Sequence, residues 1–322
     1  MGQIDLNGGL NRMFGGLGVA IDHPNVQLEI NPSDTLQVTG VSCGEVEKLA
    51  LQFYTITNLT PAAHIEVTSV IPSHVGLGSG TQLAMGVAMG LAKCHGLDLR
   101  EVEMARLMDR GGSRSSIGLG AFIQGGFLVD GGRRVSTYGP KQGDPAYIPP
   151  ITVRHRFPES WKFVVAIPDK IQGLHGQEEM NAFQKMKPMP PEMVGTISWL
   201  VLMKLLPALV EEDIISFGEA LNQMEAQLDI YFRPVQGDTA ANKMSSYLVR
   251  EMKKWGALCA GQSSWGPTVY GLVRNSEAGS LEKKVKELLQ GSGRVFVASV
   301  RNQGATFTKL KSDKHCATLT RM

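Results

Sequence analysis

The sequence of 322 residues predicts an α+β fold made of two domains. Strand-like and helix-like segments alternate over residues 1–130, helical patterns dominate residues 191–255, and the alternation returns over residues 257–300. An apolar content of 43% supplies a core for each half. We therefore expect an N-terminal α/β domain over residues 1–150 and a C-terminal α+β domain over residues 151–322.

In the first domain, short runs rich in β-branched residues predict strands, and longer runs with apolar residues at helical spacing predict helices. Residues 131–150 are rich in glycine, proline, lysine and arginine without periodicity, so we expect a surface connection or a lid there. The expected strands cover residues 26–30, 35–41, 64–71 and 127–129, and the expected helices cover residues 45–54, 79–94 and 100–110.

In the second domain, residues 161–167 form an apolar run that predicts a buried strand. The polar segment over residues 174–187 is expected to be a mobile loop. Two helices are expected over residues 191–233, a third over 240–255 and a fourth over 281–289, and strands are expected over 257–260, 268–273 and 294–300.

The composition is that of an ordinary soluble protein. The net charge is +2 and 19% of residues are charged, so composition predicts neither nucleic-acid binding nor attraction to a membrane surface. The four cysteines are far apart and show no C-x-x-C spacing, which indicates reduced thiols in a cytoplasmic protein. We find no continuous apolar stretch of membrane-spanning length, and residues 1–5 lack the order of a secretory signal.

The glycine-rich segment over residues 72–82 is the most informative one. Gly76, Gly78 and Gly80 carry no Cβ, so the backbone can take positive φ and approach a bulky anion. The helix expected from Ser79 turns its free N–H groups and positive dipole end toward the same point. This predicts a phosphate or pyrophosphate site, with a plain tight turn as the alternative. The glycine spacing matches neither the dinucleotide-binding fingerprint nor the P-loop.

Three other segments can complete an anion-binding cleft. Residues 7–18 and 261–267 are glycine-rich and can expose backbone N–H groups at turns, although either could be a simple loop. Residues 110–118 add the guanidinium groups of Arg110 and Arg114 and three serine hydroxyls, which suit phosphate or carboxylate. A solvated, serine-rich turn is the alternative for this last segment.

The motifs resemble those of a known superfamily. Residues 72–82 resemble the second motif of the galactokinase, homoserine kinase, mevalonate kinase and phosphomevalonate kinase superfamily, and residues 261–266 resemble a degenerate third motif. More specifically, residues 4–21, 110–122 and 125–132 together resemble the beta-ribofuranosylaminobenzene 5'-phosphate synthases. The resemblance covers most of the chain, is strongest before residue 132, and implies the two-domain kinase-superfamily fold. It also implies a strand ahead of Ile4 with an arginine, an isoleucine or leucine, and a histidine; whether the native chain carries it stays open.

The resemblance implies a glycosyltransferase rather than a kinase. Enzymes of that family join phosphoribosyl pyrophosphate to 4-aminobenzoate or 4-hydroxybenzoate and release carbon dioxide and pyrophosphate in methanopterin biosynthesis. Kinases of the superfamily place an aspartate base where alignment on Gly125 and Gly126 puts Gly118, which cannot take a proton. Gly80 stands where the kinase motif usually has a second serine. An ATP-dependent small-molecule kinase and a non-catalytic sugar-phosphate sensor remain alternatives.

Candidate roles follow from the motifs and the resemblance. Asp5 is placed near the ribose or a metal, with capping of a turn as an equal alternative, and Asp130 is expected to be a turn residue. His74 could donate a proton during loss of carbon dioxide. The resemblance also implies a Mg2+ ion bridging pyrophosphate, with its protein ligands left open, and analogy suggests a homodimer. The catalytic candidates are Asp5, His74 and Arg114, and the phosphate-binding candidates are Arg12, Gly76, Leu77, Gly78, Ser79, Gly80, Arg110, Ser115 and Ser116.

Overall fold

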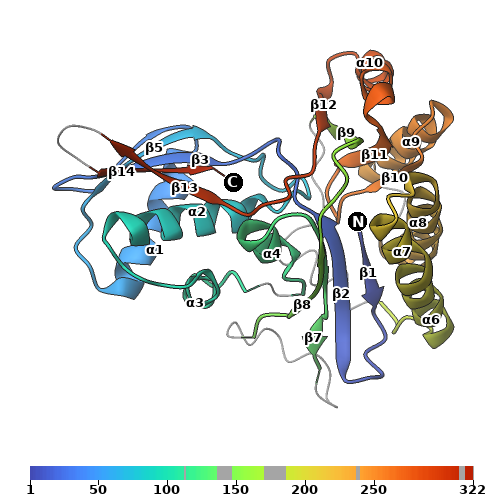
Figure 1. Ribbon diagram of the computed structural model, residues 1–322, viewed down its shortest axis with the longest axis horizontal. Coiled ribbons are helices and arrows are strands. Elements are labelled where there is room, and N and C mark those ends of the chain that lie inside the picture. The colour runs from blue at the N-terminus through green and yellow to red at the C-terminus, as the bar shows by residue number, and fades with distance from the viewer. Residues whose placement is uncertain (112–113, 136–146, 170–185, 237–239, 312–315, 322) are drawn as a thin grey trace.

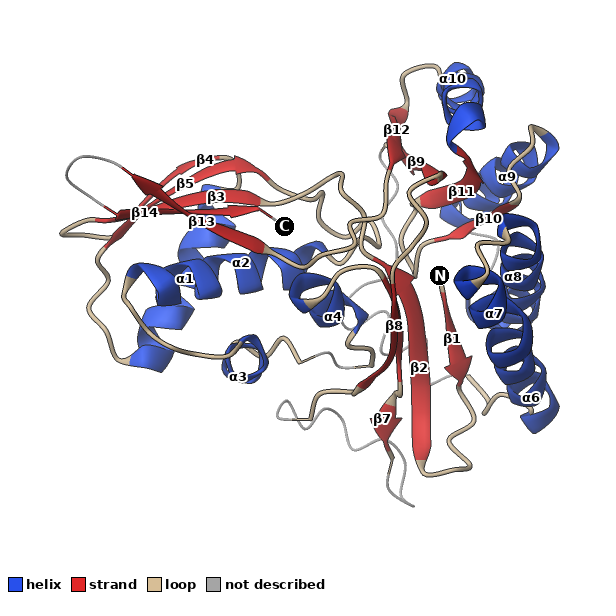
Figure 2. Ribbon diagram, in the orientation of Figure 1, coloured by secondary structure: helices blue, strands red, loops and turns tan. Residues whose placement is uncertain are grey.

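The computed structural model describes residues 1–111, 114–135, 147–169, 186–236, 240–311 and 316–321. Figure 1 shows two lobes, one on each side of the long strand β2 (Arg12–Val19). Figure 2 shows helices α1 to α4 in one lobe and helices α6 to α10 along the outer side of the other. The mixture of sheets and helices agrees with the α+β fold that the sequence predicts.

The first lobe is a five-stranded sheet covered by helices on one face. Its strand order is β13-β14-β3-β5-β4, with β4 and β5 parallel and the other pairs antiparallel. Buried side chains of α1 and α2 pack against the apolar face of the sheet and form the core of this lobe. The elements are β3 (Gln27–Pro32), β4 (Gln37–Gly40), α1 (Cys43–Thr57), β5 (Ala63–Ser69), α2 (Ser79–Cys94), α3 (Glu101–Leu107), α4 (Ile117–Ile123), β13 (Thr306–Lys311) and β14 (Cys316–Arg321).

A second sheet lies between the lobes. Its path is β1-β2-β6-β8, formed by β1 (Gly2–Asp5), β2, β6 (Phe127–Asp130) and β8 (Ile151–His155), and β7 (Arg133–Arg134) pairs with β2. The prediction of an N–H-rich turn over residues 7–18 is wrong for most of that segment, because residues 12–19 form β2. The glycines serve close packing instead. A Cβ on Gly18 would stand 2.4 Å from Cγ2 of Ile117, at the start of α4.

The third sheet, β10-β11-β9-β12, forms the second lobe with its helices. Phe157 meets the rings of Trp161 and Phe217 edge to face, with ring centroids 5.2 and 5.6 Å apart, and these rings fill the space between β9 and α8. The elements are β9 (Trp161–Pro168), α6 (Pro191–Leu200), the π-helical turn η1 (Val201–Leu205), α7 (Leu206–Val210), α8 (Ile214–Gln236), α9 (Ala240–Lys254), β10 (Cys259–Gln262), β11 (Val269–Arg274), α10 (Asn275–Leu289) and β12 (Gly293–Ala298).

One helical stretch departs from the sequence prediction on membrane spans. Residues 191–210 are long and apolar enough to cross a membrane, with a mean hydropathy of 1.9, and 33% of that window is buried inside the protein. The expectation that no stretch reaches this length is therefore corrected. Length and composition are weak evidence for a span, because core helices of soluble proteins pass the same test.

The expected division at residue 150 is crossed by two sheets. β6 pairs with β8, and the C-terminal strand β14 pairs with β3 in the first lobe. The hairpin of β13 and β14 was not predicted, because its partner strand lies at the other end of the sequence. The proposed lid over residues 131–150 and the proposed loop over residues 174–187 fall largely outside the described residues.

Candidate functional site

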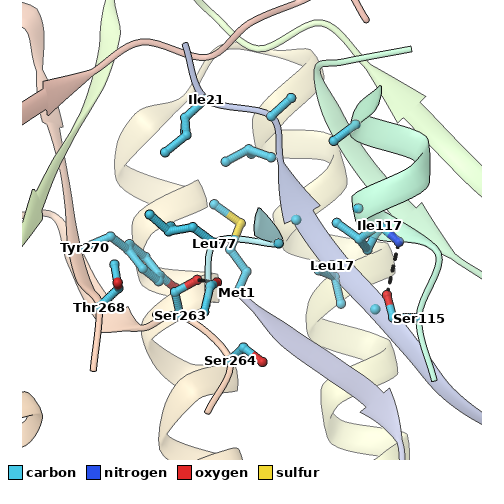
Figure 3. A pocket seen from close by; sticks show the side chains of 18 of the residues that line it. Met1, Leu17, Ile21, Leu77, Ser115, Ile117, Ser263, Ser264, Thr268 and Tyr270 are labelled. Atoms are coloured by element: carbon cyan, nitrogen blue, oxygen red, sulfur yellow. Dashed lines mark hydrogen bonds between the residues drawn. The ribbon is translucent and has the colours of Figure 1, made fainter. Parts of the chain in front are cut away.

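A cavity of about 460 Å³ opens where the two lobes and the middle sheet meet. Its walls come from β1 and β2, the loop into α2, the start of α4, helix α8, and the loop between β10 and β11 (Figure 3). All four segments singled out in the sequence reach this cavity. Three of them contain Gly76, Ser115 and Ser263, and the fourth contributes Gly16 and Gly18 from β2. The glycine-rich segments thus lie around a single space.

Two glycine-rich loops touch each other through their backbones at the edge of the cavity. Gly76 and Gly78 have φ of +87° and +70°. The hydroxyl of Ser263 donates a hydrogen bond of 2.8 Å to the carbonyl oxygen of Gly76. A Cβ on Gly76 would stand 2.2 Å from the carbonyl oxygen of Ser263, and one on Gly266 would stand 2.1 Å from that of Val75. This contact leaves no room for side chains, so the glycines are required for the loops to meet.

A cationic side chain lies beside the N-terminus of α2. A Cβ on Gly80, in the first turn of this helix, would stand 3.9 Å from Nη1 of Arg110. The Nε atom of Arg110 is buried and finds no hydrogen-bond acceptor among the described residues. The first N–H groups of a helix also lack intrahelical acceptors, and they carry the positive end of its dipole. Arg110 and the start of α2 therefore offer donors and positive charge to one anion.

Asp130 holds the start of α4 in place. Its Oδ2 accepts hydrogen bonds from Oγ of Ser115 at 2.5 Å and from the backbone N–H of Ser116 at 3.0 Å. Its Oδ1 accepts one from the N–H of Gly132 at 2.8 Å, which is a turn contact. The residue is 1% exposed, and three donors already occupy its carboxylate.

Gly118 lines the cavity without a side chain of its own. It faces Thr81, whose Cβ would lie 3.4 Å from a Cβ on Gly118, and its carbonyl oxygen accepts a hydrogen bond of 2.6 Å from Nε2 of Gln82. Gly118 therefore brings no side chain to the cavity, and a Cβ at this position would be in ordinary contact with Thr81.

Two acidic residues of α8, Glu225 and Asp229, line the opposite wall, and sequence reasoning missed both. The hydroxyl of Tyr270 donates a hydrogen bond of 2.7 Å to Oε1 of Glu225. Burial raises the pKa of Glu225 to about 7 and raises that of Tyr270 well above 10. A signal was present in the sequence, because Glu225 shares a helix face with the buried Leu221 and Leu228.

The candidate residues differ in their position relative to the cavity. Gly76, Leu77, Gly78 and Ser115 line the cavity. Ser79, Gly80 and Ser116 are not part of the lining but adjoin lining residues in the chain, and Arg110 lies beside Gly80. The remaining candidates, Asp5, Arg12, His74 and Arg114, are not part of the cavity lining formed by the described residues.

Asp5 and Arg12 lie at the far end of the β1–β2 hairpin. Asp5 Oδ1 accepts hydrogen bonds from the N–H groups of Asn7 at 2.7 Å and Gly8 at 3.1 Å, so it caps a turn. Arg12 Nη1 donates to the carbonyl oxygens of Gly131 at 2.8 Å and Gly132 at 2.9 Å. Their catalytic and phosphate-binding roles stay predictions, and so do those of His74, in an exposed turn with φ of 60°, and Arg114.

Glu225 predicts a pH dependence of stability. Its pKa is about 7 in the folded protein against an ordinary value of 4.5, so the folded state holds the proton more tightly. The resulting stabilisation is full below pH 4.5 and is lost as the pH rises through about 7. At about pH 8, Glu225→Gln should therefore increase the free energy of unfolding by up to about 3 kcal/mol, and at low pH by almost nothing.

Thermal melting at the two pH values measures this difference. The control is Glu219→Gln, on the same helix but exposed and ion-paired with Lys204, and it should show no such gain at high pH. A Glu225→Gln protein that melts like the wild type at both pH values would contradict the raised pKa.

Comparison with curated proteins gives relatives over nearly the whole chain. Residues 45–126 match the GHMP kinases N terminal domain, and residues 205–291 match the GHMP kinases C terminal domain. The chain is 34% identical over 319 residues to the beta-ribofuranosylphenol 5'-phosphate synthase of Methanothermobacter thermautotrophicus, with 95% of each protein covered. It is 35% identical over 313 residues to the synthase of the same name from Archaeoglobus fulgidus, with 94% of each covered.

Solved structures of kinases share the fold. The mevalonate kinase of L. major superimposes with a TM-score of 0.66 at 16% identity over 90% of each chain. The homoserine kinase of Cytophaga hutchinsonii gives a TM-score of 0.63 at 17% identity, covering 94% of this chain and 93% of that one. At these identities the likeness shows the fold alone.

Proposed function

The chain belongs to the family of the beta-ribofuranosylphenol 5'-phosphate synthases, and on this premise we propose that it joins phosphoribosyl pyrophosphate to 4-hydroxybenzoate. Carbon dioxide and pyrophosphate leave, and the product is a ribosylated phenol 5'-phosphate for methanopterin biosynthesis. The name of the relatives specifies a phenol, so the hydroxyl acceptor is favoured over 4-aminobenzoate.

The observation that carries this proposal is an anion cradle beside which the described residues place no acidic side chain that faces the cavity; Glu225 and Asp229 lie on the opposite wall. The N-terminus of α2 and Arg110 provide donors for a polyanion, while Gly118 leaves the kinase base position empty. Asp130 does not replace that base, because three hydrogen-bond donors hold its carboxylate behind the wall of the cavity. Phosphoryl transfer to an alcohol needs such a group, whereas departure of pyrophosphate needs only positioning and charge stabilisation.

In this proposal the pyrophosphate lies against the backbone of residues 76–80. As the bond from the anomeric carbon to pyrophosphate breaks, negative charge grows on the leaving oxygens. The N–H groups at the start of α2 and the guanidinium of Arg110 stabilise that charge more in the transition state than in the ground state. The ribose then extends past Thr81 and Gly118 toward the open part of the cavity.

We propose Mg2+ as the metal that accompanies the pyrophosphate. Among the described residues, no group of three or more histidine, cysteine, aspartate or glutamate side chains could hold a metal. Magnesium commonly binds through substrate phosphates with few protein ligands, so in this proposal the ion enters together with phosphoribosyl pyrophosphate. When bound, it would neutralise charge on the leaving group.

Replacing Arg110 by alanine tests the cradle. Loss of a cation that contacts phosphate should raise the KM for phosphoribosyl pyrophosphate by about 10- to 100-fold, with a smaller change in the KM for the benzoate. Initial rates at varied donor concentration measure it. The control is Arg100→Ala, since Arg100 is exposed and ion-paired with Glu103. Unchanged donor KM in Arg110→Ala would remove this residue from the site.

The decisive experiment follows the carboxyl carbon. The protein is incubated with phosphoribosyl pyrophosphate, Mg2+ and carboxyl-labelled 4-hydroxybenzoate, and released label and pyrophosphate are counted, with a parallel arm lacking Mg2+. We expect both products in equal amounts. ATP consumption with a panel of alcohol acceptors would indicate a kinase instead, and donor binding without product would indicate a sensor.

We also propose a cytoplasmic homodimer. The α6–η1 segment and α7 expose large apolar side chains: Trp199 is 67% exposed, Leu202 61%, Met203 68% and Val210 62%. A cluster of this kind on one helical stretch is typical of a protein contact surface. Light scattering on the purified protein measures the mass in solution, and a monomer at micromolar concentration would contradict the dimer.

A further inference from the structure

The end of the cavity that lies in the second lobe has walls suited to an aromatic ring. Phe163 and Val165 of β9, Leu228 of α8 and the ring of Tyr270 on β11 line it, and each is less than one-tenth exposed. Figure 3 shows Tyr270 and Thr268 on the side of the cavity opposite to Ser115 and Ile117. The apolar end is thus separate from the start of α4, where Gly118 lies near the anion cradle.

This apolar end also contains polar atoms without partners. The hydroxyl of Thr268 is buried and has no hydrogen-bond partner among the described residues, and the residue is only 1% exposed. The Oε1 atom of Gln3, on β1, is also buried and has no hydrogen-bond partner among the described residues. Both residues line the cavity, as does Glu225, whose Oε1 accepts from Tyr270. Buried polar atoms are normally paired, so these atoms point to a ligand with a polar group.

We propose that the ring of the 4-hydroxybenzoate acceptor lies between these apolar side chains, with its hydroxyl donating to Glu225 and accepting from Thr268. This inference rests on the proposed function and assigns the acceptor end of the site. A phenol matches this end of the cavity, because its ring needs apolar contact while its hydroxyl needs one acceptor and one donor. The carboxyl-bearing carbon, at the opposite end of the ring, then points toward the ribose.

Glu225 acts in this scheme as the base for the phenol. Its carboxylate takes the hydroxyl proton while electron density from the oxygen moves through the ring to the carbon that carries the carboxylate. That carbon forms the new bond to the anomeric carbon, and pyrophosphate leaves with the electron pair of the broken C–O bond. The bond to the carboxyl carbon then breaks, carbon dioxide leaves, and its electron pair restores the aromatic ring. Glu225 returns the proton to the oxygen.

The surroundings of Glu225 allow this role near neutral pH. The ionisable groups that face it are Tyr270 on β11, Cys259 on β10, Asp229 on α8, Lys253 on α9 and the amino group of Met1, the residue before β1. Burial dominates among these influences and raises the pKa of Glu225 to about 7, which is near the optimum for a base working at neutral pH. Because the ionised form is the active one, the rate should fall as the pH drops below about 7.

The test uses Glu225→Gln in the full chain. It should lower kcat for 4-hydroxybenzoate by about 100-fold or more, leave the KM for phosphoribosyl pyrophosphate within about twofold, and remove the acidic limb of the pH–rate profile. Glu225→Asp should recover part of the rate together with the acidic limb. Glu219→Gln, exposed on the same helix, should behave like the wild type. Circular dichroism and thermal melting show whether each variant is folded.

Two outcomes would overturn the inference. Glu225→Gln could keep its kcat and its pH profile, in which case no proton passes through this residue. It could also raise only the donor KM, which would place Glu225 against phosphoribosyl pyrophosphate rather than against the phenol. Failure of the proposed function is a different result, since the folded wild-type protein would then release no labelled carbon dioxide at all.

Discussion

Replacing Gly266 by alanine should abolish most of the activity and lower the melting temperature by several degrees. The added Cβ would lie 2.1 Å from the carbonyl oxygen of Val75 and 2.2 Å from its carbon, far inside van der Waals contact. Both obstacles are backbone atoms, so a change of side-chain rotamer cannot relieve the clash. The loops must separate, which costs about 3 kcal/mol or more and displaces the pyrophosphate-binding backbone of residues 76–78.

The matched control is Gly279→Ala on α10. A Cβ there meets nothing within 4 Å, and the residue is helical, so alanine should stabilise the protein by about 0.5–1 kcal/mol. Both variants are followed by thermal melting and by carbon dioxide release. A Gly266→Ala protein with wild-type activity and melting temperature would show that the two loops do not need this contact.

Placing an aspartate at position 118 should weaken the binding of phosphoribosyl pyrophosphate by about 100-fold or more. Gly118 faces Thr81 at the cavity wall, so the new carboxylate would stand beside the proposed pyrophosphate. Two like charges about 6 Å apart repel by about 3 kcal/mol at the effective dielectric constant of a protein surface. The measurement is the KM for the donor, or its dissociation constant by calorimetry.

Gly118→Ala separates charge from size in this experiment. Its Cβ would meet Thr81 at 3.4–3.6 Å, which is ordinary contact, so activity should stay close to that of the wild type. Equal donor binding by Gly118→Asp and Gly118→Ala would place the pyrophosphate elsewhere in the cavity. Strong loss in both would indicate a steric requirement instead.

The sequence predicted those parts of the fold that depend on local patterns. The helix expected over residues 79–94 has these bounds in the structure, because a glycine-rich turn precedes it and apolar residues at helical spacing fill it. The strand at residues 161–167 was found in the same way, as β9. Elements whose formation depends on distant partners escaped prediction, and the hairpin of β13 and β14 is the clearest example.

The sequence predicts the parts of the site that depend on local backbone geometry. It does not reveal the parts that depend on contacts between distant segments. The turn at Gly76 and Gly78 could be identified because positive φ favours glycine. The glycines at 16 and 18 gave a misleading signal, because their purpose is to let α4 approach β2, and only the three-dimensional structure shows that approach. The role of Glu225 could not be inferred from its place on an apolar helix face, because its hydrogen-bond partner Tyr270 lies on a different element.

The return of β14 to pair with β3 has a consequence for synthesis on the ribosome. β3 is translated long before β14, so one flank of the sheet stays unpaired while the residues between the two strands are made. Unpaired strand edges attract other chains. The nascent chain therefore carries an unpaired strand edge, which can be covered only after β14 has left the ribosomal exit tunnel.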